Sequence, residues 1–169
     1  MNRRKAIAAL SLTSLVSAQS VRKQIVGVWK LVSYDWKDKA SGEVRHPFGD
    51  HPVGRITYDA AGRMSAQLMR AERKTLGGPS TLGAVSAVAA ASDQDLREMV
   101  SGYVGYFGTF DIDEAARTVI HHVEGALIPS WVGTDLRRVY EFAGDRLILT
   151  GALDQAVVRL VWQRDGKAA

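Results

Sequence analysis

Hydrophobic and polar residues alternate along most of the chain, in short segments that end at glycines or other turn residues. The segments are rich in β-branched and aromatic residues, and this composition with a period of two predicts antiparallel β-strands. Eight strands are expected, at 25–36, 54–59, 62–70, 106–113, 117–125, 135–142, 146–153 and 156–164. Because short turns join most of them, they can form a meander that closes and leaves no exposed edge. The sequence therefore predicts an all-β fold: an eight-stranded up-and-down antiparallel β-barrel.

One segment, residues 77–103, departs from this pattern and predicts a short helix. Ser92 is a suitable N-cap, and two aspartates follow it in the first turn, where the helix dipole favours negative charge. Leu96, Met99 and Val100 are spaced i, i+3, i+4 and would form one apolar stripe. We expect this stripe to cover part of the barrel, either as a structural element or as a lid over its mouth.

Two adjacent histidines, His121 and His122, lie in the predicted strand 117–125. Adjacent residues on a strand point to opposite faces, so the two cannot both face one site. His121 shares its face with Val119 and Val123, which makes His121 the inward-facing histidine.

The same alternation places further polar groups inside the barrel. Tyr106, Arg138 and Tyr140 are expected to join His121 in a mainly apolar interior, together with Phe110. On the first strand, one face is expected to hold Gly27, Trp29, Leu31 and Ser33. Any one of the polar residues could be a buried group satisfied by its neighbours. As a set, they are typical of a small-molecule site.

The composition limits the compartment and the partners. The formal charge of +4 comes from 22 Lys+Arg and 18 Asp+Glu. The first residues, MNRRKAIAALSLTSLVSAQS, have the basic, apolar and small-residue regions of an export signal over residues 1–18. Without Arg3, Arg4 and Lys5 the balance is 19 to 18, which gives no reason to expect nucleic acid. We expect a single barrel domain over 19–169, periplasmic or secreted, with no membrane segment after the signal is removed.

The sequence gives little support to a metal or nucleophilic centre. The chain has no cysteine, which excludes disulfides and thiolate ligands, and it has no G-x-S-x-G motif. His46, Asp50 and His51 lie in one loop and could bind a metal ion, but loop polarity explains them as well. We expect neither a metal nor a cofactor.

Several stretches, in order, resemble the bacterial and fungal lipocalin-like domain family over about residues 25 to 164. They are GVWKLVSY, GRITYDAAGRMSAQLMR, YFGTFDID, VIHHVEGALIPSWVGTDLRRVYEF and the last two strands. The resemblance implies an eight-stranded barrel with an internal pocket, and no particular reaction. The residues it carries into the pocket region are His121, Trp131, Gly133 and Arg138.

The end of the chain supports closure of the barrel. In the broader lipocalins, which this family resembles, an arginine of the last strand covers a tryptophan of the first, and Arg164 and Trp29 fit these roles. Trp162 precedes the arginine by two residues, and we expect the three side chains to form a structural plug.

Three functions are compatible with such a barrel. The first is binding of a small hydrophobic molecule that carries a polar or anionic group. The residues expected to bind it are Tyr58, Met64, Tyr106, Phe110, His121, Trp131, Arg138 and Tyr140. The second is an isomerase, cyclase or lyase, with His121 as general acid/base and Tyr106 or Arg138 stabilising negative charge. The third is a barrel packed shut by its own side chains, with no site.

The export signal makes a direct prediction about the mature chain. Cleavage after Ala18 should leave Gln19 as the first residue, because Val16 and Ala18 are spaced as a cleavage site requires. Intact-mass measurement of the exported protein tests this. An exported form that still begins at Met1 would contradict it.

Overall fold

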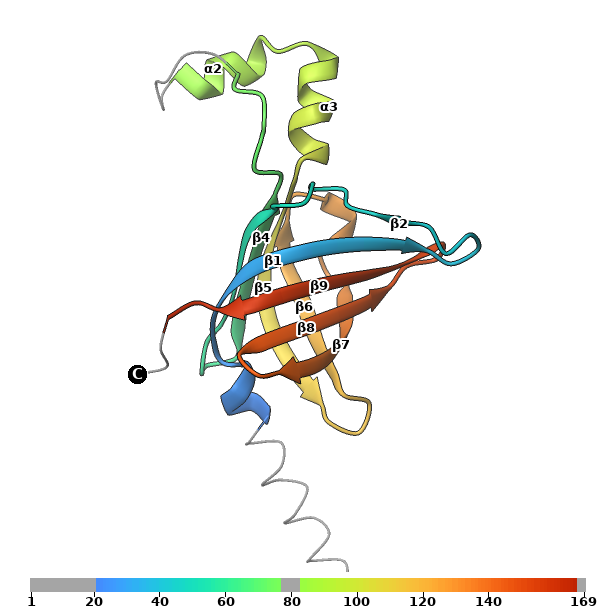
Figure 1. The fold of residues 1–169 in the computed structure, drawn as a ribbon. Helices are drawn as coiled ribbons and strands as arrows, with labels where there is room; N and C mark the ends of the chain where they lie inside the picture. Colours follow the sequence, from blue (N-terminus) through green and yellow to red (C-terminus); the bar gives the residue numbers. More distant parts are fainter. Residues whose placement is uncertain (1–20, 77–82, 167–169) are drawn as a thin grey trace, which may run out of the picture.

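The fold is a closed antiparallel barrel (Figure 1). The structure, a computed structural model, describes residues 21–76 and 83–166, so the expected leader lies outside the described residues. The strands are β1 (Gly27–Asp38), β2 (Val44–Arg45), β3 (Val53–Tyr58), β4 (Arg63–Met69), β5 (Tyr103–Asp113), β6 (Thr118–Ala126), β7 (Asp135–Ala143), β8 (Arg146–Ala152) and β9 (Ala156–Arg164). Each strand from β3 to β9 pairs with the next, and β1 pairs with both β3 and β9. The predicted eight-stranded barrel is confirmed, with the short β2 added beside β1.

Strand β1 does not keep one face inward along its length. Its pairing with β9 shifts between Leu31 and Ser33, where the register is broken by a β-bulge or similar irregularity. Beyond this point Tyr34 lies opposite Leu160, which faces the interior. The prediction that Ser33 shares the inward face of Trp29 is therefore wrong, because an extra residue reverses the alternation.

One end of the barrel is plugged. Residues 21–25 are helical, and the carbonyl of Ile25 accepts a hydrogen bond from the Trp29 indole over 2.8 Å. The Arg164 guanidinium lies 4.0 Å from the centre of the Trp29 ring and donates to the carbonyls of Val26 and Gln24. The predicted closure by Trp29 and Arg164 is confirmed, while Trp162 lies deeper, on the wall of the interior.

The residue beside this contact has to be a glycine. At Gly27, φ is +140°, and a Cβ would lie 2.6 Å from the Arg164 guanidinium. A side chain there would be strained in its backbone and would displace the arginine.

The opposite end of the barrel is here called the open end. It carries the longer connections between strands and one turn: residues 39–52, 70–102, 127–134 and 153–155. The second connection contains the helices α2 (Gly83–Ala89) and α3 (Asp93–Ser101), which rise away from the barrel (Figure 1). The expected N-cap is confirmed, since the Ser92 side chain accepts from the Asp95 amide. No residue of α3 is buried, however.

The expectation that the helix stripe covers the barrel is therefore wrong for the described residues. Arg73 donates to the Met99 carbonyl over 2.8 Å, and Lys74 forms an ion pair with Asp95. These contacts attach α3 to its own connection instead of to the barrel wall. No helix in the described ranges is both long and apolar enough to cross a membrane.

The plug predicts a specific loss of stability. Replacing Arg164 with Met should lower the free energy of unfolding by about 1–3 kcal/mol, because the stacking on Trp29 and the bonds to two carbonyls are lost. Urea unfolding should show a lower midpoint with an unchanged slope.

Arg159→Met is the matched control on the same strand. Arg159 is half-exposed and lies 3.8 Å from Asp35, and such surface pairs contribute at most about 1 kcal/mol. Equal losses in the two variants would contradict the role given to Arg164.

Candidate functional site

A cavity of about 100 Å³ lies inside the barrel and reaches toward its open end. Most of its wall is aliphatic or aromatic, and a few polar side chains are spread over it. The lining residues are Tyr34, Phe48, Ile56, Leu68, Val104, Tyr106, His121, Trp131, Arg138, Leu149, Leu153, Val158, Leu160 and Trp162. An apolar cavity with a few polar groups is the usual form of a small-molecule site.

His121 is the most buried polar residue of the site. Its side chain projects inward from β6 and is 0% exposed. The Tyr58 hydroxyl lies 2.7 Å from Nε2, and the Tyr106 hydroxyl lies 3.0 Å from Nδ1. Both ring nitrogens are therefore hydrogen-bonded to tyrosines, one from β3 and one from β5.

Burial keeps this cluster neutral. Loss of solvation, aided by the positive charge of Arg138, lowers the pKa of His121 to about 3. Burial also raises the pKa of Tyr106 and raises that of Tyr58 well above its ordinary value. The imidazole thus has one N–H and one acceptor nitrogen across the usual pH range.

Neutrality and burial together fix the direction of the hydrogen bonds. Tyr58 is 1% exposed, does not line the cavity, and has His121 as its hydrogen-bond partner. If Nε2 carried the proton, the Tyr58 hydrogen would be left without an acceptor, at a cost of about 1–3 kcal/mol. The favoured arrangement has Tyr58 donating to Nε2 and Nδ1–H donating to Tyr106. The Tyr106 hydrogen is then free to point into the cavity.

Arg138 brings positive charge to the wall of the cavity. Its side chain leaves β7 and lies over Gly151 of β8, where a Cβ would be 2.9 Å from Nη1 and 3.0 Å from Cδ. Gly151 thus makes the space that the arginine occupies. None of the described residues lining the cavity is acidic, so the charge of Arg138 is not balanced there.

Two tryptophans, Trp131 and Trp162, also line the cavity. Trp131 ends the short 3₁₀ helix η1 (Pro129–Trp131), and its ring meets the edge of Tyr106 at 5.7 Å between centres. Trp162 is 1% exposed, and its indole Nε1 has no hydrogen-bond partner within the described protein. An unpaired buried N–H costs about 1–3 kcal/mol, which is unusual enough to need an explanation.

The structure brings together only part of the predicted set. Tyr106, His121, Trp131 and Arg138 line the cavity, and Tyr58 supports His121 from behind. The remaining predicted residues are buried deeper in the barrel and do not line the cavity: Met64, Phe110 and Tyr140. Gly133 is exposed in the loop that follows η1.

Three other residues, Tyr34, Phe48 and Trp162, line the cavity and are not among the predicted site residues. Trp162 could have been found, because strict alternation along β9 puts it on the face of Val158 and Leu160. Tyr34 was hidden by the irregularity in β1, and Phe48 comes from a loop with no periodic pattern. The third predicted possibility, a fully packed lumen, holds only for the plugged half of the barrel.

His122 points away from the cavity, as predicted. Its Nδ1 lies 2.7 Å from Asp135 and its Nε2 lies 3.2 Å from Asp111, on the two neighbouring strands. The hydrogen bond to Asp135 is the main cause that raises the pKa of His122. The loop histidine His46 is paired with Asp35 at 3.1 Å. Within residues 21–76 and 83–166, no group of three acidic or histidine side chains is placed to hold a metal ion.

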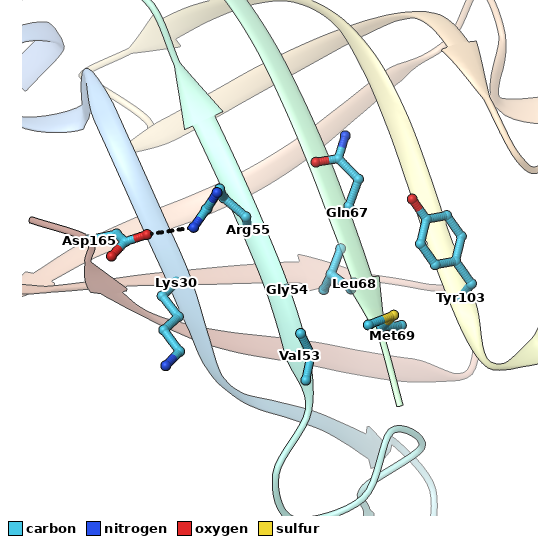
Figure 2. Close-up of a pocket in the computed structure, with 9 residues that line it drawn as sticks. All are labelled: Lys30, Val53, Gly54, Arg55, Gln67, Leu68, Met69, Tyr103 and Asp165. Atoms are coloured by element: carbon cyan, nitrogen blue, oxygen red, sulfur yellow. Dashed lines mark hydrogen bonds and ion pairs between the residues drawn. The ribbon is translucent and has the colours of Figure 1, made fainter. Parts of the chain in front are cut away.

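A larger hollow of about 380 Å³ lies between the side chains of β1, β3, β4 and β5 (Figure 2). Its wall includes exposed Lys30 and Gln67, and Arg55, which is paired with Asp165 at 2.9 Å. The charged side chains of this groove are exposed or paired with one another, whereas the cavity at His121 holds polar groups that are buried. The enclosed cavity at His121 is therefore the better candidate site.

The protein is an up-and-down β-barrel of eight strands that encloses a mainly apolar cavity. The chain belongs to the lipocalin-like domain family, whose model matches residues 26–165.

One similar protein is the 4'-hydroxy-3'-methoxypropiophenone carrier protein ppsC of Aspergillus oryzae. It is 34% identical over 93 residues, which cover 52% of this chain and 78% of the relative. Two solved structures are more distant matches. A REP1-NXSQ fatty acid transporter is 13% identical with a TM-score of 0.40, and a mutant of the fluorescent protein UnaG is 12% identical with a TM-score of 0.38. Each match covers 86% of this chain and 99% of the other.

The two adjacent histidines should titrate in opposite ways. Nitrogen-15 NMR should show His121 neutral down to about pH 4, and His122 protonating above the ordinary pKa of 6.5. For His121, the folded pKa lies below the unfolded one, so its contribution to stability is complete above about pH 6.5 and is lost as the pH falls toward 3. For His122, the contribution is complete below about pH 6.5 and is lost as the pH rises through the raised folded pKa. A His121 resonance that titrates near pH 6.5 would contradict the burial of His121 between Tyr58 and Tyr106.

Proposed function

We propose that the protein is a carrier that binds a small, mainly apolar molecule in the cavity at the open end of the barrel. The single observation that supports this most strongly is the cavity wall, whose lining residues are apolar except for Tyr34, Tyr106, His121, Arg138 and the two tryptophans. Apolar walls provide the binding energy and a few polar groups orient the ligand.

The volume suggests a compact ligand. A cavity of about 100 Å³ is smaller than the apolar cavity of about 150 Å³ that holds benzene, so a ligand with one ring would fill it and extend toward the open end of the barrel. The relative in Aspergillus oryzae is named as the carrier of a propiophenone, which is a single-ring ketone. That name supports a ligand with a single ring here, with its substituents reaching toward the open end.

Arg138 supports a polar or anionic group on the ligand. The guanidinium reaches the cavity wall, and its field acts on His121 and Tyr34. With no acidic residue among the described lining residues, an anionic or strongly polar oxygen would be the natural partner of this cation.

The geometry favours a carrier over an enzyme. A general acid/base must reach the substrate with a titrating nitrogen. Both nitrogens of His121 are already bonded to tyrosines, and its pKa of about 3 makes it a weak base. The isomerase, cyclase or lyase alternative, which gives the proton transfer to His121, is therefore the weaker proposal.

The N-terminal basic and apolar regions support export of this carrier. In this proposal, the mature protein would take up its ligand in the periplasm or outside the cell.

Arg138 gives the direct test. Benzoate is a suitable anionic probe, and toluene is a neutral molecule of similar size. Arg138→Met should weaken benzoate binding about 10-fold or more, because a charge-assisted hydrogen bond contributes about 1.5–3 kcal/mol. Toluene affinity should stay within about twofold. Isothermal titration calorimetry measures both.

Arg137→Met is the matched control, because Arg137 is the exposed neighbour on the same strand. If the two variants weaken benzoate equally, Arg138 makes no specific contact. If neither benzoate nor toluene binds the wild-type protein, the carrier function itself is wrong.

A further inference from the structure

The indole Nε1 of Trp162 is buried and unpaired within the described protein. This side chain is 1% exposed, and it lines the cavity. A buried N–H is normally paired, so this one is expected to meet an acceptor that the protein itself does not supply. A bound molecule with an oxygen acceptor would supply it.

The Tyr106 hydroxyl points its hydrogen toward the cavity, because its oxygen accepts from His121. The buried Tyr58 must donate its hydrogen to His121 Nε2, since the structure offers it no other partner. The neutral ring then donates from Nδ1 to the Tyr106 oxygen, at 3.0 Å. Tyr106 keeps its own hydrogen for the cavity that it lines.

The polar groups on the described cavity wall are mainly hydrogen-bond donors. Trp131, Trp162 and Arg138 can only donate, and Tyr106 presents a hydrogen. His121 has no free nitrogen. Tyr34 is the one hydroxyl on the wall, among the described residues, whose direction is not fixed by a protein partner.

We propose that Tyr106 O–H and Trp162 Nε1–H are the recognition donors of the cavity, and that they select ligands bearing an oxygen acceptor such as a carbonyl, phenolate or carboxylate oxygen. The inference rests on the proposed carrier function and specifies the ligand class for that cavity. Tyr58 and His121 are positioning residues, because they act through Tyr106 and make its hydroxyl a donor.

The proposal is tested with two probes of nearly the same shape. Acetophenone has a C=O group where α-methylstyrene has C=CH₂, so the pair differs mainly in the acceptor. Both affinities are measured by calorimetry, supported by fluorescence of the tryptophans in the wall. The quantity compared between variants is the ratio of the two dissociation constants, because it cancels changes in cavity size that affect both probes.

Three variants should change this ratio. Tyr106→Phe and Trp162→Phe should each weaken acetophenone about 3- to 10-fold relative to α-methylstyrene, because each removes one hydrogen bond. Tyr58→Phe should change the ratio in the same direction by a smaller factor, although Tyr58 does not touch the cavity. Tyr140→Phe is the matched control, since Tyr140 is a buried tyrosine that does not line the cavity, and it should leave the ratio unchanged.

The outcomes separate this inference from the carrier function. If neither probe binds, the proposed function fails. If both bind and the ratio is the same in wild type, Tyr106→Phe and Trp162→Phe, only the donor assignment fails. If Tyr58→Phe alone leaves the ratio unchanged, the positioning role of Tyr58 and His121 is overturned.

A measurement on the wild-type protein keeps the proposal testable if a variant does not fold. Nitrogen-15 NMR of His121 should show a protonated Nδ1 and an unprotonated Nε2. The opposite tautomer would mean that Tyr106 donates to the ring and has no hydrogen for the ligand, which would overturn the assignment of Tyr106 as a recognition donor.

Discussion

Pairing of β1 with β9 is the constraint on which the rest of the structure depends. These strands pair from Trp29–Arg164 at the plugged end to Asp38–Ala156 at the open end. The contact turns an open meander into a barrel with a fixed inside and outside. Without it, His121 could not be buried on all sides and the cavity would have no wall on the side of Trp162.

The pairing also explains why the barrel is hollow at one end only. At the plugged end, β1 pairs with β3 as well, and the interior between them is filled by large side chains such as Trp29, Tyr58 and Phe110. Pairing of β1 with β3 ends at Lys30, and β1 then continues beside β9 alone until β2 joins it. The cavity lies in this upper part of the barrel, where the connecting loops form its mouth.

The polar cluster lies between these two halves. A histidine at 0% exposure is tolerated because both nitrogens are satisfied and the ring stays neutral. The same arrangement removes the free nitrogen and the near-neutral pKa that a general base would need. One physical cause, burial with complete hydrogen bonding, therefore both stabilises the cluster and leaves His121 without a free nitrogen.

Much of this could be predicted from the sequence, because strand alternation is a strong signal where strands are regular. It separated His121 from His122 and placed Tyr106 and Arg138 on the inner wall. It failed at Ser33 and Tyr34, because one extra residue in β1 reverses the faces, and no local pattern marks that position. The helix stripe of Leu96 and Met99 was correctly periodic but stays unburied, since periodicity shows which residues share a face and not what that face meets.

The hydrogen-bond partners of His121 could not be predicted from the sequence. Tyr58 is 63 residues away along the chain, and only the curvature of the closed barrel brings its hydroxyl to Nε2. The unpaired N–H of Trp162 is likewise visible only in three dimensions. Long-range register and side-chain direction decide both, and neither is encoded in local spacing.

A crystal structure with acetophenone bound would test the central claim most directly. We expect the ring inside the barrel, against Leu160 and Trp131, with the ketone oxygen about 3 Å from the Tyr106 hydroxyl or the Trp162 indole nitrogen. A ring bound in the outer groove near Arg55, or a ketone oxygen that points away from both donors, would contradict it.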